Sequence, residues 1–279
     1  MDGGPSRTAM MAAGGRAAHL IVDSAPYLFQ DTVAADLLGA QAGEVIGYHR
    51  QFGDHVVLSG TRAQVNARSS YTEARVRTGF GQYVILGAGL DTFAYRSPLA
   101  RQIAVFEVDH PATQQWKRGL LETAGIDATA TRFVGVDFER DDLAAKLAAQ
   151  GFDSATPALV SWLGVSMYLT EAAISAVLTV LGTFAPGTEL VLEYALPPEL
   201  RDESGTAYAE FALPAAADQG EPWLSFFTPD ALTDLLDKHG FTVAEHISQR
   251  ETVSPDLWQR ADNLRPADLC RLLRASVSD

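Results

Sequence analysis

Gln82-Tyr-Val-Ile-Leu-Gly-Ala-Gly-Leu-Asp-Thr92 joins an apolar run to two glycines and then to the start of a helix. The run Gln82–Leu86 predicts a buried β-strand. Glycines at a strand-to-helix turn let the backbone approach a ligand closely, and the first turn of the helix offers free N–H groups. A plain tight turn fits the same residues equally well, so this stretch needs support from its neighbours.

An acidic residue follows each of the next two predicted strands. Asp109 comes directly after the strand Ile103–Val108, 20 positions beyond the second glycine. A carboxylate there can accept hydrogen bonds from both ribose hydroxyls of an adenosine ligand. After the strand Arg132–Val136, Asp137 could bind the adenine amino group with Phe138 against the ring, and capping of the next helix is an equally supported role for Asp137. Together with the glycines, these residues predict an adenosine ligand at the switch point of an open sheet.

A nicotinamide dinucleotide is the main competing ligand, because its sites also combine glycines with an acidic residue about 20 positions later. The third glycine position of that motif is occupied here by Thr92. A side chain at this point hinders the close helix-to-strand approach beside a pyrophosphate. The sequence therefore disfavours a dinucleotide.

Short β-branched runs alternate with helical stretches from residue 82 onward, which predicts a doubly wound α/β fold with a mostly parallel sheet. The helix Thr170–Ala185 has one apolar stripe, and another helix begins after Thr228 with Pro229 in its first turn. The predicted strands are Gln82–Leu86, Ile103–Val108, Arg132–Val136, Ala158–Leu163, Glu189–Tyr194 and Phe241–Ile247.

The chain shows no internal repeat and no low-complexity linker, so we expect a single domain over residues 1–279. Residues 1–78 are expected to form a mainly helical N-terminal cap region, and residues 79–195 the ligand-binding core. Residues 196–224, which lack clean periodicity, are interpreted as a cap insertion after the fifth strand. Residues 225–279 complete the core.

Composition narrows the class of partner. Acidic residues outnumber basic ones by 35 to 21, which gives a net charge of −14 and disfavours nucleic acid. Cys270 is the only cysteine, so a disulfide or thiolate zinc cluster within one chain is excluded, and a cytoplasmic location is expected. The six histidines have no metal-ligand spacing, and no apolar run approaches the length of a membrane span. We expect neither a metal nor a membrane partner.

The segments Gln82–Arg96, Phe106–Pro111 and Ser161–Thr170 together resemble the leucine carboxyl methyltransferase-like family. Within it they are most similar to the bacterial branch that includes polyketide O-methyltransferases, and the similarity runs from about Arg7 to Pro266. The resemblance implies a class I methyltransferase with a Rossmann-like, seven-stranded sheet and S-adenosyl-L-methionine as cofactor.

The resemblance also implies roles for particular residues. The family places an arginine upstream of the first strand on the methionine carboxylate, and Arg68 matches its motif best, with Arg62 as the alternative. Asp109 would bind the ribose, and Asp137 with Phe138 the adenine. Gly87, Ala88 and Gly89 would contact the amino acid portion; Asp91, His110 and Leu163 complete the predicted cofactor contacts, Leu163 through its main chain.

Methyl transfer from a sulfonium is an in-line displacement that mainly requires desolvation and alignment. A phenol acceptor needs a base and a carboxylate does not, and no residue of this sequence is singled out as that base. The predicted function is an O-methyltransferase acting on a hydroxyl or carboxyl oxygen of a small molecule, such as a polyketide or another secondary metabolite. The alternatives are a protein carboxyl methyltransferase, an NAD(P)-dependent oxidoreductase and a non-catalytic cofactor-binding module.

Overall fold

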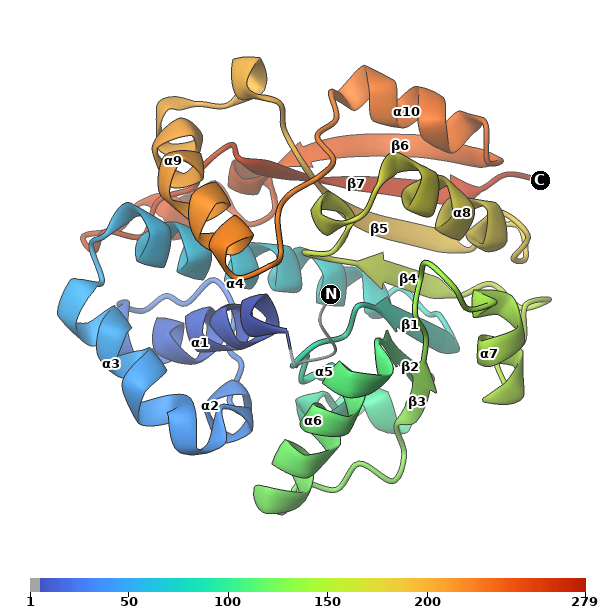
Figure 1. Cartoon of the computed structure of the whole chain (residues 1–279), viewed down its shortest axis with the longest axis horizontal. Coiled ribbons are helices and arrows are strands. Elements are labelled where there is room, and N and C mark those ends of the chain that lie inside the picture. Colours follow the sequence, from blue (N-terminus) through green and yellow to red (C-terminus); the bar gives the residue numbers. More distant parts are fainter. Residues whose placement is uncertain (1–5) are drawn as a thin grey trace.

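A computed structural model describes residues 6–279 (Figure 1). Its centre is one seven-stranded sheet with the strand order β3-β2-β1-β4-β5-β7-β6. Pairing is parallel except on both sides of β7, which runs antiparallel to β5 and to β6. The strands are β1 Gln82–Leu86, β2 Ala104–Asp109, β3 Arg132–Gly135, β4 Leu159–Trp162, β5 Glu189–Ala195, β6 Phe241–Ser248 and β7 Cys270–Val277.

The predicted doubly wound, mostly parallel sheet is confirmed. The six strands located from the sequence appear with ends that differ by one residue at most. The seventh strand, β7, was expected from the family resemblance but was not located, because the charged residues Arg271 and Arg274 interrupt its apolar pattern. Both arginines are half-buried on a strand that pairs on each side.

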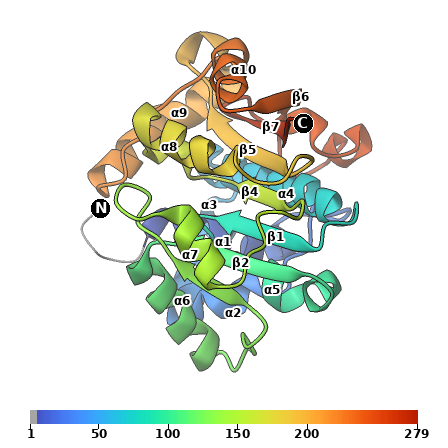
Figure 2. The ribbon, with the colours of Figure 1, turned by 90° about the vertical axis from the view of Figure 1, so that its right-hand side faces the viewer.

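Helices cover both faces of the sheet, and Figures 1 and 2 show α8 and α4 on opposite sides of β4 and β5. This explains why β1 and β4 are mostly apolar, since every residue of each is buried, including the polar Gln82 and Ser161. The helices are α1 Arg7–Val22, α2 Ala34–Leu37, α3 Ala42–Phe52, α4 Val56–Val76, α5 Phe93–Arg96, α6 Pro111–Thr123, α7 Leu143–Ala149, α8 Glu171–Leu181, α9 Glu203–Asp218 and α10 Pro229–Asp237.

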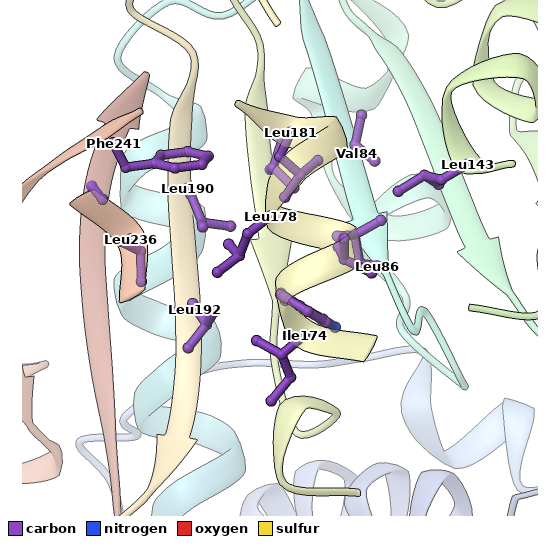
Figure 3. Close-up of a cluster of buried hydrophobic side chains, with 14 of the residues drawn as sticks. Val84, Leu86, Leu143, Ile174, Leu178, Leu181, Leu190, Leu192, Leu236 and Phe241 are labelled. Carbon is purple, nitrogen blue, oxygen red and sulfur yellow. The ribbon is translucent and has the colours of Figure 1, made fainter. Parts of the chain in front are cut away.

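The larger core cluster lies between the sheet and α7, α8 and α10. Figure 3 shows Leu178 of α8 pointing toward Leu190 and Leu192 of β5, and Ile174 and Leu181 of the same helix belong to the same buried cluster. Thr170 caps this helix, because its hydroxyl accepts the Ala173 N–H at 3.2 Å. Thr228 caps α10 in the same way through Ala231 at 3.2 Å. The packed core therefore holds in place the carboxyl ends of the parallel strands, where the sequence analysis predicted the ligand site.

The N-terminal part is helical, as predicted, over its described residues. Its longest helix, α4, lies along the face of the sheet opposite α8 (Figure 1). Arg62 on α4 is buried and pairs with Asp23 through two hydrogen bonds of 2.8 and 3.0 Å, which ties α4 to the end of α1. Desolvation by burial tends to raise the pKa of Asp23, but the hydrogen bonds and charges of His19 and Arg62 outweigh it and hold this pKa below its usual range.

The segment 196–224 contains a regular helix that the sequence reading missed. Helix α9 begins after Asp202, whose carboxylate accepts the Gly205 N–H at 2.6 Å, and it continues through an internal Pro214. Alanines and one proline gave it no clear amphipathic stripe. Tertiary contact supplies what the pattern lacks: the Tyr208 hydroxyl lies 2.7 Å from that of Thr61 on α4.

Candidate functional site

A cavity of about 560 Å³ opens at the carboxyl ends of the parallel strands. Its lining comes from α1, α4 and α9 and from the loops that follow β1, β2, β3 and β4. The structure brings all ten predicted cofactor residues to this cavity: Arg68, Gly87, Ala88, Gly89, Asp91, Asp109, His110, Asp137, Phe138 and Leu163. Residues from seven separate segments thus converge where a ligand of an open α/β sheet is expected.

The loop after β1 requires its two glycines. Gly87 and Gly89 have φ angles of +65° and +47°, which residues with a side chain rarely adopt. A Cβ atom at Gly87 would lie 2.2 Å from a methyl group of Val165, and one at Gly89 would lie 3.0 Å from the Cβ of Ala9. The bare backbone therefore forms part of the cavity wall, with the Ala88 N–H donating to the Val108 carbonyl at 3.0 Å.

Asp109 ends β2 and holds the glycine loop. Its two carboxylate oxygens accept the backbone N–H groups of Gly89 at 2.5 Å and His110 at 2.6 Å. Burial raises the pKa of Asp109 above its ordinary value, although both hydrogen bonds oppose that shift. Each oxygen retains a lone pair, so the carboxylate can still accept from a hydroxyl pair in the cavity.

Asp137 does not cap the helix that follows it, which settles one alternative from the sequence. The cap of α7 is Asp142, whose carboxylate accepts the Ala145 N–H at 3.0 Å. Asp137 instead accepts the Glu139 N–H at 3.1 Å within a turn beside the cavity. Phe138 lies next to it, and its ring centroid is 6.4 Å from that of the buried Trp162.

The remaining predicted side chains already have protein partners. His110 caps α6 by accepting the Ala112 N–H at 3.2 Å. Asp91 accepts the Phe93 N–H at 2.8 Å at the start of α5. Leu163 borders the cavity beside Gly164, which has a φ angle of +68°. These residues shape the wall while stabilising the local backbone.

Of the two candidate arginines, only Arg68 faces the cavity. Arg62 is fully engaged by Asp23, by the Gly53 carbonyl at 3.0 Å and by His49 at 3.1 Å. The Arg62 guanidinium also contributes, with burial, to lowering the pKa of His49 to about 4. Arg68 lies two turns further along α4, contacts the loop after β4 and forms an ion pair with Glu193.

The other end of the cavity is aromatic and apolar. Tyr168 of the short turn Ser166–Tyr168 meets Trp223 edge to face, with ring centroids 6.1 Å apart. Tyr208 and Ala212 on α9 line the same end. Burial raises the pKa of Tyr168 to about 12 and that of Tyr208 further, so both phenols remain protonated near neutrality.

Three residues that support the site were missed by sequence reasoning: Arg16, Glu193 and Gly164. Arg16 on α1 donates to the Leu90 carbonyl at 2.7 Å and to Asp31 at 2.8 Å, and Thr92 donates to the same carboxylate at 2.7 Å. The available signal was a single arginine, Arg16, in an alanine-rich helical segment, but its partners Asp31 and Leu90 are distant in the chain. Glu193 and Gly164 gave no local signal at all.

Among residues 6–279, no group of three or more His, Cys, Asp or Glu side chains is placed to hold a metal ion. In the same residues, no helix is long and apolar enough to cross a membrane.

Comparison with known proteins gives consistent matches. Residues 9–182 match the family profile described as "Leucine carboxyl methyltransferase". A Bacillus subtilis protein named "Putative S-adenosyl-L-methionine-dependent methyltransferase YktD" is 31% identical over 97% of this chain and 97% of its own. A Mycobacterium avium protein named "Putative S-adenosyl-L-methionine-dependent methyltransferase" is 34% identical over 67% of this chain and 65% of its own.

Among solved structures, one from Bordetella parapertussis, described as that of a possible exported protein, aligns with a TM-score of 0.53. It covers 98% of this chain and 96% of its own at 13% identity, a likeness that concerns the fold alone.

Proposed function

Because this chain belongs to the leucine carboxyl methyltransferase family, we propose that it transfers a methyl group to a hydroxyl or carboxyl oxygen of a small molecule. The methyl donor is S-adenosyl-L-methionine, as for the relatives named above. The observation that carries the proposal is the convergence of the glycine loop, Asp109 and Arg68 on one cavity that extends beyond them to an aromatic end.

The residues present fit the donor. Left-handed glycines and their bare backbone offer close approach, and Asp109 offers acceptors to a sugar. Arg68 offers a planar, permanently charged partner for a carboxylate. When bound, the donor supplies a methyl group activated by a sulfonium. The protein supplies binding, orientation and exclusion of water.

A small-molecule acceptor fits the aromatic end better than a peptide does. Tyr168, Trp223 and Ala212 line that end with aromatic and apolar surface, which is typical of small-molecule sites, whereas an extended peptide binds through main-chain hydrogen bonds along a groove or sheet edge. The two tyrosines keep their protons near neutral pH and can orient an oxygen by hydrogen bonding. No residue is assigned as a base, so both hydroxyl and carboxyl targets remain within the proposal.

The test is incubation of purified protein with donor labelled in its methyl group and a panel of phenols, enols and carboxylic acids. Transfer to an oxygen of a panel member is the expected result. Tight binding of S-adenosylhomocysteine without transfer to any member would leave a non-catalytic module. Transfer only to peptides with a free carboxyl terminus would favour a protein methyltransferase, and tight NADH binding in a fluorescence titration would favour an oxidoreductase.

A further inference from the structure

Two ion pairs join α4 to β5 on the face of the sheet opposite α8. Arg68 pairs with Glu193, and Arg75 pairs with Glu189. The two arginines are seven residues apart on the helix, about 10 Å, and the two glutamates are four residues apart on the strand, about 13 Å. These similar spacings allow both ion pairs to form between the same two elements. The two pairs have the same chemistry and the same supporting elements, but only Arg68 reaches the cavity.

The Arg75–Glu189 pair is closed. The guanidinium of Arg75 donates two hydrogen bonds to the carboxylate, at 2.7 and 2.8 Å, and Arg274 adds a contact at 3.4 Å. This arrangement raises the pKa of Arg75 through its bond with Glu189. Both partners lie toward the amino end of β5, away from the cavity, so the pair joins helix to sheet.

The Arg68–Glu193 pair is open on one side. Glu193 is buried, and its two oxygens are used by Arg68 Nη1 and by Gln64 Nε2, the latter at 2.8 Å. Among residues 6–279, the hydrogen bonds of Arg68 involve Nη1 alone. Its Nε and Nη2 donors are left for a cavity ligand.

Gly164 provides the space in which the guanidinium lies. A Cβ atom at this position would be 2.7 Å from Nη1 and 3.0 Å from Nη2 of Arg68. The guanidinium therefore rests against bare backbone at the loop after β4, with Glu193 holding one end of it. Its orientation is set by the protein before any ligand binds.

We propose that Glu193 is a positioning residue for the methyl donor: it fixes Arg68 so that the free donors of the guanidinium face the donor's carboxylate. This inference rests on the proposed function of the cavity. It concerns a residue on β5 that does not itself line the cavity.

Two physical effects predict that loss of Glu193 weakens binding of the methyl donor. An arginine side chain has large rotamer freedom, and without Glu193 that freedom must be lost when the donor binds. Asp91, Asp109 and Asp137 line the same cavity and would compete for a released guanidinium. The charge of Glu193 is offset by the guanidinium of Arg68 with which it pairs, and it adds little net repulsion because S-adenosylhomocysteine carries one ammonium against one carboxylate.

The experiment uses calorimetry with two ligands. S-adenosylhomocysteine carries the amino acid end, and methylthioadenosine lacks it. We expect Glu193→Ala to weaken S-adenosylhomocysteine about tenfold and Glu193→Gln, which keeps one acceptor for Arg68, about threefold. Methylthioadenosine should bind all variants within about twofold of the wild type. Glu189→Ala is the matched control and should leave both affinities unchanged while lowering the unfolding temperature.

A double-mutant cycle separates positioning from a merely structural role. In an Arg68→Gln background, Glu193→Gln should have no further effect on S-adenosylhomocysteine, because the effect passes through Arg68. Unchanged or tighter binding in the folded Glu193→Gln protein, or an equal loss for both ligands, overturns the inference. Absence of any S-adenosylhomocysteine binding to wild-type protein would instead overturn the proposed function.

Discussion

The two ends of the cavity are built in different ways. Apart from Arg68 on α4, the donor end consists of loops that follow successive strands, and their glycines and acidic residues are visible in the sequence. The aromatic end consists of α9, the turn Ser166–Tyr168 and the segment 219–224, which meet only through tertiary contacts. A ligand that many proteins share is encoded locally, whereas the compartment for an individual acceptor depends on distant segments.

The largest expected effect concerns the ribose contact at the donor end. Asp109→Ala should weaken S-adenosylhomocysteine about a hundredfold, because hydrogen bonds to a charged group are lost and the Gly89 N–H loses its acceptor. Calorimetry measures the affinity. We expect the affinity of Asp109→Asn to lie between those of the wild type and Asp109→Ala. The control is Asp127→Ala on an exposed loop, and equal affinities for the two alanine variants would contradict the ribose role.

The glycine loop gives the next effect. Gly87→Ala places a methyl group against Val165 and should weaken S-adenosylhomocysteine about thirtyfold, with a loss of about 3 kcal/mol of stability. Gly125→Ala is the control, because Gly125 has a nearly equal φ of +66° with open space around it. That variant should lose about 1 kcal/mol in a denaturant titration and keep its affinity. Matching losses would mean that backbone strain alone matters.

A substitution at the aromatic end should slow methyl transfer and leave the affinity for S-adenosylhomocysteine unchanged. Ala212→Trp fills space under α9 and should slow transfer to an acceptor found by the labelled-donor screen about tenfold, while S-adenosylhomocysteine affinity stays within about twofold. Ala217→Trp, on the exposed face of the same helix, is the control. Should Ala212→Trp weaken the donor product as much as it slows transfer, the two ends would not be separate.

The smallest effect is a difference in pH response. Burial raises the pKa of Asp109, so its carboxylate protonates at a higher pH than an ordinary aspartate, and affinity for S-adenosylhomocysteine should fall as pH falls. We expect a progressive loss of affinity as the pH falls below 7, the smallest of these effects, measured by calorimetry. The loss should disappear in Asp109→Asn and persist in His110→Asn. The pKa of Tyr168, about 12, predicts no matching change at the aromatic end.

Much of the fold and of the donor end was predictable from the sequence. Buried parallel strands give continuous apolar runs, and the turns between strand and helix require residues such as Gly87 with a positive φ. Caps such as Thr170 act on backbone groups three residues away, so they too are local. The choice between Arg68 and Arg62 was not local, because it depended on where Asp23 and Glu193 lie in space.

The rest depended on burial and on distant partners. Helix α9 shows no clear apolar stripe because it packs through Tyr208 and alanines rather than through a leucine row. β7 carries arginines whose partners are on other elements, such as Glu245 for Arg274 at 2.7 Å. Such pairs are readable only once the chain is folded.

The first described residues and the last strand reach opposite ends of the parallel strands. Ser6 and Thr8 line the cavity, and the Thr8 N–H donates to Glu221 at 3.2 Å. The last strand instead runs away from that edge, so that Ser276 is opposite Glu189 at the amino end of β5. A purification tag or a surface tether attached after Asp279 should therefore leave the cavity mouth open, whereas a bulky substitution at Ser6 or Thr8 would lie in its wall.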